Sequence, residues 1–266
     1  MVLPIDANDD SMGVPTASTR SVRDLRRPAR WQNARLIEII EEAREAVTLR
    51  LRLEESSGFL PGQYYNVRLT LPGRTGSVQR AYSVASSPVP DSLTIEIGVR
   101  EVPGGLISPR LVRGLDVGDL VQVRGPVGRF TWTADDGGPV LLVGAGSGVV
   151  PLMSMIRYAQ ESGLDVPMRL VSSSSDFDHA FYHSDLTDLA DRNAWLKVVH
   201  TFTRDPSDPR ATHHRRIDYS MVAEAVADLF PARAYICGPP AMVEDVQRWL
   251  GELGVDPDRV RVEKYD

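Results

Sequence analysis

The sequence has very little cysteine: Cys237 is the single one among 266 residues. One thiol cannot form an internal disulfide, a structural zinc site or the four-cysteine ligation of an iron–sulfur cluster. The chain also lacks an apolar run of the roughly 20 residues that a membrane helix needs. Its N-terminus lacks the hydrophobic segment and cleavage pattern of a secretory signal. These absences predict a cytoplasmic protein that holds no metal of its own.

The composition is that of a globular protein, with 42% hydrophobic residues, 25% charged residues and a formal net charge of −6. The length exceeds that of one ordinary core and predicts two domains. Residues 1–30 are polar and aperiodic, which indicates an N-terminal extension. It is rich in arginine: Arg20, Arg23, Arg26, Arg27 and Arg30. These side chains either bind an acidic partner or form a solvated tail, and neither half of the chain is basic enough for nucleic-acid binding.

The first half of the chain after this extension has the pattern of short strands. Apolar residues alternate with polar ones over residues 47–53 and 93–99, which is the period of a strand with one buried face. Further strand candidates are residues 35–40, 64–70, 80–85 and 120–124, separated by proline and glycine turns. Six short strands with little helix predict a closed antiparallel Greek-key β-barrel, which we place at residues 31–134.

After Asp135 and Asp136, which we interpret as an interdomain turn, the pattern changes to alternating strands and helices. The expected strands are residues 139–143, 168–172, 197–201, 234–237 and 260–262. The expected helices are residues 150–162, 182–192, 219–230 and 241–250. Such alternation predicts a parallel sheet, so residues 135–266 are expected to form an α/β domain. The fold class is therefore a two-domain β plus α/β protein.

A glycine-rich turn follows the first strand of this second domain. Gly144, Gly146 and Gly148 lead into a helix that carries Pro151 in its first turn. Such a turn lets backbone N–H groups and the positive end of a helix approach a pyrophosphate. A tight turn without a ligand is the alternative, but the position between a buried strand and a helix favours a dinucleotide site. The spacing differs from the G-x-G-x-x-G fingerprint.

In the β half, Arg80, Ala81, Tyr82 and Ser83 form a second motif. Arginine offers a planar fork for phosphate, tyrosine a flat surface and serine a small hydrogen-bond partner, which suits a flavin dinucleotide. Alone, the segment could be an ordinary strand with an exposed arginine. Further along, Pro103 to Ser108 forms a glycine turn in which Ser108 could cap a helix over residues 108–111, another phosphate-compatible N-terminus.

In their order and spacing from about Trp31 to the C-terminus, these segments, together with Cys237-Gly238-Pro239, resemble the ferredoxin–NAD(P)⁺ reductase superfamily of flavin–nicotinamide reductases. The resemblance implies that Arg80 binds the FAD pyrophosphate, that Tyr82 lies against the flavin and that Ser83 bonds near flavin N5, with Ala81 between them. It also implies that Gly105, Leu106, Ile107 and Ser108 form a phosphate loop. Nicotinamide dinucleotide would bind at Gly144, Gly146, Gly148, Pro151, Cys237, Gly238 and Pro239.

The C-terminus matches the family's Glu-x-aromatic pattern at Glu263 and Tyr265. The resemblance implies that Tyr265 covers the flavin until nicotinamide displaces it; a frayed terminal residue is the alternative. With Ser83 and Cys237, these two complete the residues expected at the catalytic centre.

Two departures from the family pattern bear on cofactor and partner. Ser174 stands where relatives often have an arginine for the NADP 2′-phosphate, whereas Arg204 matches the other adenosine-side arginine. A lost charge-assisted contact is worth roughly 1.5–3 kcal/mol, so NADH and NADPH both stay open. The second departure is that many relatives fuse a plant-type iron–sulfur domain, whose cysteines this chain lacks.

The resemblance therefore implies a stand-alone FAD-dependent NAD(P)H reductase. Hydride would pass from nicotinamide to flavin N5, and electrons would then leave for a separate acceptor, a ferredoxin or an oxygenase component. Arg20, Arg23, Arg26 and Arg27 would suit docking of an acidic ferredoxin. The alternatives are a diaphorase that reduces free flavin, quinone or ferric chelates, and a non-catalytic nucleotide-binding subunit. Metal binding at His213 and His214 is not expected, because adjacent histidines lack a converging carboxylate.

Overall fold

The computed structural model describes residues 29–265, apart from 57, 72, 74 and 90–91. Arg20, Arg23, Arg26 and Arg27 lie outside the described residues, and Arg30 is the first residue of β1. Within the described part of the chain, no helix is long and apolar enough to cross a membrane.

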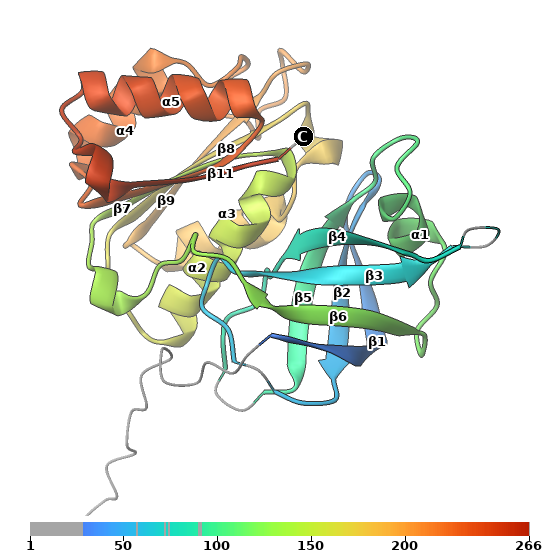
Figure 1. The fold of residues 1–266 in the computed structure, drawn as a ribbon. Coiled ribbons are helices and arrows are strands. Elements are labelled where there is room, and N and C mark those ends of the chain that lie inside the picture. The colour runs from blue at the N-terminus through green and yellow to red at the C-terminus, as the bar shows by residue number, and fades with distance from the viewer. Residues whose placement is uncertain (1–28, 57, 72, 74, 90–91, 266) are drawn as a thin grey trace, which may run out of the picture.

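The first sheet is antiparallel and has the order β4-β3-β6-β1-β2-β5 (Figure 1). Its strands are β1 (Arg30–Ala43), β2 (Ala46–Leu53), β3 (Tyr64–Thr70), β4 (Ser77–Ser83), β5 (Thr94–Arg100) and β6 (Leu120–Val127). The six-stranded β-barrel predicted from the alternation is confirmed. β1 is longer than predicted, because register shifts after Leu36 and after Glu41 interrupt its alternation. Leu49, Leu51, Ile95 and Ile97 point into the barrel core.

The two edge strands of this sheet meet directly after β4. Val84 and Ile97 form an isolated antiparallel bridge, and the Ala85 amide donates to the Glu96 carbonyl oxygen at 2.7 Å. The Val84 amide donates to the Gln63 carbonyl oxygen at 2.9 Å. These bonds close the barrel with very few residues, so the segment that follows Ser83 is held on both sides.

The second sheet is parallel and has the order β11-β10-β7-β8-β9. Its strands are β7 (Val140–Ala145), β8 (Met168–Ser174), β9 (Leu196–Phe202), β10 (Arg233–Gly238) and β11 (Val260–Lys264). The helices are α2 (Val149–Glu161), α3 (His183–Arg192), α4 (Tyr219–Leu229) and α5 (Pro240–Glu252). Figure 1 shows α4 and α5 on one face and α2 and α3 on the other, which faces the barrel. The predicted α/β domain is confirmed.

Residues of β7 alternate between two cores. Val140 and Leu142 pack with α2 and α3, whereas Leu141 and Val143 pack with α4 and α5. A strand buried on both faces reads as a continuous apolar run, which is why it was visible in the sequence. The two domains join through a short 3₁₀ turn, Ala134–Asp136, in which the Asp136 carboxylate accepts a hydrogen bond from the Thr133 amide at 2.9 Å.

Candidate flavin and nicotinamide site

The strand order of the parallel sheet indicates where a ligand would bind. β8 and β9 lie on one side of β7, and β10 and β11 lie on the other, so the connections leave in opposite directions at the carboxyl ends of β7 and β10. Ligands of open α/β sheets bind at such a switch point. Gly146 and Gly148 follow β7, and Pro239 follows β10. Two segments that lie about 90 residues apart in sequence therefore meet at one edge of the sheet.

Strand register brings several expected site residues into one row. Glu263 is paired with Cys237 across β11 and β10, and Cys237 is paired with Gly144 across β10 and β7. Beyond Gly144 the row continues through Ser172 to His200. Burial raises the pKa of the Glu263 carboxyl, so this group holds a proton more readily than a free glutamate does.

The glycine turn, the 3₁₀ segment Gly146–Gly148, is too crowded for side chains. A Cβ at Gly148 would lie 2.2 Å from the Cys237 carbonyl oxygen, and Gly146 has the positive φ of 54° that glycine adopts without strain. Helix α2 begins directly after the turn, with Pro151 as its third residue. This cradle of backbone beside a helix N-terminus fits a dinucleotide pyrophosphate.

Tyr265 lies in this turn. Its hydroxyl accepts a hydrogen bond from the Gly148 amide at 2.9 Å and donates one to the Ala145 carbonyl oxygen, while burial raises its pKa to about 12. The backbone amide of Tyr265 donates to the Gly238 carbonyl oxygen at 3.3 Å. Tyr265, the last residue that the structure describes, is therefore packed into the glycine turn and is not frayed.

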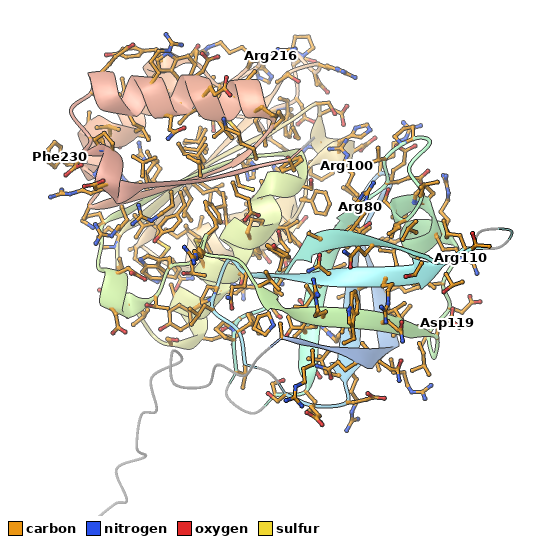
Figure 2. All side chains as sticks on the ribbon, viewed as in Figure 1. Arg80, Arg100, Arg110, Asp119, Arg216 and Phe230 are labelled. Carbon is orange, nitrogen blue, oxygen red and sulfur yellow. The ribbon has the colours of Figure 1, made fainter. Side chains whose placement is uncertain are left out.

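Arg100, at the end of β5, reaches the same turn and was not singled out from the sequence. A Cβ at Gly146 would lie 3.2 Å from Arg100 Nη1 and 3.5 Å from the Tyr265 hydroxyl. Figure 2 shows Arg100 and Arg80 on the side of the barrel that faces the α/β domain, and Asp119 at the far end. An arginine at a strand terminus a few residues before the Pro103–Gly105 turn is the signal that could have identified it.

The flavin motif lies on β4, an edge strand of the barrel. Arg80, Tyr82 and Ser83 pair with Val67, Tyr65 and Tyr64 of β3. The Arg80 guanidinium is exposed and bonds only the Gln79 carbonyl oxygen, at 3.0 Å, among the described residues. Burial raises the pKa of Tyr82 to about 12, so its hydroxyl stays neutral. An exposed guanidinium beside a half-buried aromatic ring fits a flavin dinucleotide.

The loop after β5 holds Gly105 to Ser108. Leu106 is exposed, Ile107 packs into the barrel core, and a Cβ at Gly105 would lie 2.8 Å from the Val102 carbonyl oxygen. The expectation that Ser108 caps a helix is wrong. Helix α1 (Ser108–Arg113) starts at Ser108, its N-cap is Ile107, and the Ser108 hydroxyl accepts a hydrogen bond from the Val102 amide at 3.0 Å. The hydroxyl is used to close the loop, because that amide has no strand partner.

The ends of β8 and β9 bring together Ser174 and Arg204, the two residues that the resemblance places at the adenosine end. The Thr203 amide donates to the Ser174 carbonyl oxygen at 3.0 Å, and the Arg204 amide donates to the Ser175 carbonyl oxygen at 2.8 Å. Ser174 is buried, with its hydroxyl on the Asp176 carbonyl oxygen, whereas the Arg204 side chain is exposed. Among the described residues, no group of three or more histidine, cysteine or carboxylate side chains could hold a metal ion.

Cys237 is buried, and desolvation with the nearby Glu263 carboxylate raises its thiol pKa. Because the thiolate is the reactive form, we expect a disulfide reagent at pH 8 to label the folded protein roughly two orders of magnitude more slowly than the protein unfolded in guanidinium. The Cys237→Ala variant, which has no thiol, should take up no label in either state. Rapid stoichiometric labelling of the folded protein would contradict this burial.

A barrel that presents an exposed arginine beside an aromatic ring, joined to an α/β domain whose glycine turn leads into a helix, is typical of a two-domain flavin and nicotinamide oxidoreductase. The sequence matches the family described as oxidoreductase FAD-binding domain over residues 33–132 and the family described as oxidoreductase NAD-binding domain over residues 142–248. The chain belongs to the ferredoxin–NAD(P)⁺ reductase superfamily and is an FAD-dependent NAD(P)H oxidoreductase.

Individual relatives agree with this assignment. The reductase component of the naphthalene 1,2-dioxygenase/salicylate 5-hydroxylase systems of Ralstonia sp. is 32% identical over 242 residues, which are 90% of this chain and 70% of that protein. The aromatic O-demethylase reductase subunit of Amycolatopsis is 30% identical, over 94% of this chain and 75% of that one. The crystal structure of Amycolatopsis cytochrome P450 reductase GcoB superposes with a TM-score of 0.76 and 27% identity, covering 89% of this chain and 70% of that chain.

Proposed function

We propose that the protein is the reductase component of an oxygenase system and passes electrons from NAD(P)H through FAD to a separate iron–sulfur acceptor. The observation that carries the proposal is the meeting of the glycine turn, Cys237 and Glu263 at one sheet edge, with Arg100 of the barrel reaching the same turn. The Ralstonia relative is named as a ferredoxin–NAD(P)⁺ reductase component of dioxygenase and hydroxylase systems, which supports an iron–sulfur acceptor.

FAD, when bound, supplies the ability to take a hydride from nicotinamide and to release electrons one at a time. In the proposal, Arg80 binds the pyrophosphate of FAD, and Gly105 to Ser108 surround a phosphate with backbone amides. Tyr82 lies against the flavin with Ala81 beside it, and Ser83 hydrogen-bonds its edge.

The nicotinamide dinucleotide would be held mainly by backbone. Gly144, Gly146 and Gly148 leave room for its pyrophosphate at the start of α2, where Arg100 adds a positive charge. Cys237, Gly238 and Pro239 would flank the nicotinamide, and Tyr265 would leave the turn when the dinucleotide enters. Ser174 and Arg204 would contact the adenosine end. In this arrangement the protein contributes orientation and exclusion of water.

Arg80→Ala should yield mostly apoprotein. Losing a charge-assisted contact to phosphate, worth roughly 1.5–3 kcal/mol, should weaken FAD binding about 10- to 150-fold. The measurement is the FAD-to-protein ratio after purification, followed by titration calorimetry with FAD. Arg192→Ala, which removes an exposed arginine on α3 that pairs with Asp188, is the matched control and should retain FAD. Full FAD retention and unchanged affinity in Arg80→Ala would contradict the assignment.

The acceptor is tested by comparing turnover. Anaerobic bleaching of the flavin by NADH and by NADPH identifies the donor, and steady-state rates with an iron–sulfur protein are then compared with rates on free flavin, quinone and ferric chelates. Faster turnover with an iron–sulfur protein supports the proposal. Small acceptors that outpace every iron–sulfur protein tested would favour a diaphorase.

A further inference from the structure

Helix α2, which starts at the glycine turn, contacts the barrel along one stripe. Val150, Ser154 and Arg157 are spaced by four and three residues and therefore lie on the same face of the helix. Val150 covers Gly98 of β5, where a Cβ would lie only 2.5 Å from Val150 Cγ2. The Ser154 hydroxyl donates to the Ser86 carbonyl oxygen at 2.7 Å. Gly98 is the position that permits this close approach.

Arg157 joins three elements at the end of this stripe. Its Nη1 donates to the Glu96 carboxylate at 2.8 Å and to the Ala85 carbonyl oxygen at 3.2 Å, and its Nη2 donates to Asp185 of α3 at 2.9 Å. The other oxygen of Glu96 accepts from Arg50 Nε at 2.9 Å and from Arg50 Nη2 at 2.7 Å. The charged groups of Arg50, Glu96, Arg157 and Asp185 thus form a row from the barrel into the α/β domain. Each ion pair restricts the side-chain conformations of both of its members.

Tyr182 makes a second connection. It precedes α3 with a φ of 54°, in the left-handed region that a bulky residue rarely adopts, and its hydroxyl lies 2.9 Å from Thr48 Oγ1 of β2. Both side chains are buried, and Thr48 is paired with Gly98. A backbone held in this conformation persists where its surroundings specify it. Thr48, Glu96, Gly98, Val150, Ser154, Arg157 and Tyr182 are here called the interdomain clamp.

The clamp joins the two halves of the active site by very short paths. On the barrel side, Ala85 and Ser86 come two and three residues after Ser83 of the flavin motif. On the other side, Val150 comes two residues after Gly148 of the nicotinamide turn. We infer that the interdomain clamp sets the distance between nicotinamide and flavin, and that Arg157 and Tyr182 are positioning residues for hydride transfer. This inference rests on the proposed roles of the flavin motif and the glycine turn.

The test is anaerobic stopped-flow reduction of the FAD-loaded protein by NADH or NADPH, whichever bleaches the flavin. Because a misplacement of about 1 Å can cost 100-fold, Arg157→Met should lower the limiting rate of flavin reduction about 100-fold and Tyr182→Phe about 10-fold. The half-saturating nicotinamide concentration should stay within about threefold, since neither residue touches the dinucleotide cradle. The nicotinamide–flavin charge-transfer absorbance should weaken in both variants. Arg157→Lys, which keeps the charge, should recover part of the rate.

Arg169→Met is the matched control. Arg169 is a buried arginine that pairs with Asp228 inside the α/β domain, so its loss removes an ion pair without touching the barrel. This variant should keep the wild-type limiting rate and charge-transfer band. Wild-type rates in both Arg157→Met and Tyr182→Phe would overturn the inference, as would an equal loss in Arg169→Met. Failure of the proposed function has a different signature: the wild-type protein would bind no FAD or would not be reduced by either nicotinamide.

Discussion

Gly148→Ala is expected to lose about 100-fold in the rate of flavin reduction by nicotinamide while it keeps its FAD. An added Cβ would lie 2.2 Å from the carbonyl oxygen of Cys237 and 2.6 Å from the carbonyl carbon of the same residue. Both are backbone atoms, so they cannot rotate away as a side chain could. To reach an ordinary contact of about 3.5 Å, the turn and β10 must move apart by roughly 1 Å. The flavin motif lies in the other domain and should be unaffected.

The measurement is anaerobic flavin reduction at saturating nicotinamide, together with the FAD-to-protein ratio. Reduction by dithionite, which does not use the turn, should proceed as in the wild type. Gly251→Ala is the control, because a Cβ at this helical position meets nothing within 4 Å. That variant should be fully active and gain about 0.5–1 kcal/mol in helix stability. A Gly148→Ala protein that is reduced at the wild-type rate would contradict the steric argument.

The second large effect is expected in acid stability. His183 and His200 stack with ring centroids 4.1 Å apart, and both are buried. Three ring nitrogens have no hydrogen-bond partner among the described residues: Nδ1 and Nε2 of His200, and Nε2 of His183. Burial, with the neighbouring His183, lowers the pKa of His200 to about 3, and burial also lowers the pKa of His183. The fold therefore requires both rings to be neutral.

The sign of the pH dependence follows from proton binding. Below the ordinary histidine pKa of 6.5, the unfolded chain binds a proton at His200 that the folded protein does not bind. The free energy of unfolding therefore decreases by about 1.4 kcal/mol for each unit by which the pH is lowered. Between pH 7 and pH 5 the His200 contribution should fall by roughly 2 kcal/mol, and His183 adds to this in the same direction. The free energy of unfolding from urea titrations at several pH values measures it.

In the His200→Phe variant, the free energy of unfolding should decrease less steeply between pH 7 and pH 5 than it does in the wild type. The carboxylates titrate alike in the variant and the wild type, so the difference between the two stability curves isolates the histidine. Asp218, whose pKa is lowered to about 2, loses its contribution only below about pH 4. As pH falls from 7 to 5, the difference in the free energy of unfolding between the two proteins should therefore shift by roughly 2 kcal/mol in favour of His200→Phe. Parallel curves over this range would show that His200 is protonated in the folded state.

Most of the fold could be predicted from local patterns. Alternation over residues 47–53 and the apolar run of β7 each report the burial of their own strand. The glycine turn was equally visible, since only glycine fits beside the Cys237 carbonyl oxygen. What local patterns could not indicate is how the domains dock. The pattern predicts an ordinary outward-facing strand residue at Thr48, yet Thr48 is fully buried and its hydroxyl lies 2.9 Å from that of Tyr182, 134 residues later.

The same reason explains the missed and misassigned site residues. Arg100 lies beside the glycine turn because the barrel packs against the α/β domain, a relation that neither segment encodes alone. Ser108 has the residue type of a helix cap, but the free Val102 amide competes for its hydroxyl. The place of Tyr265 in the turn depends on the register of β11 with β10.

The bridge between Val84 and Ile97 has a consequence for cooperativity. Within seven positions, residues 80–86 carry the flavin motif, the bridge that closes the barrel and two of the carbonyl groups to which α2 is bonded. Because the motif, the bridge and the two carbonyl groups belong to one continuous stretch of backbone, local unfolding of one of them should also disrupt the others. A ligand that binds only the native form of this stretch stabilises everything linked to it. FAD is therefore expected to stabilise the α/β domain through this stretch without touching it, and the FAD-loaded protein is expected to unfold in a single transition.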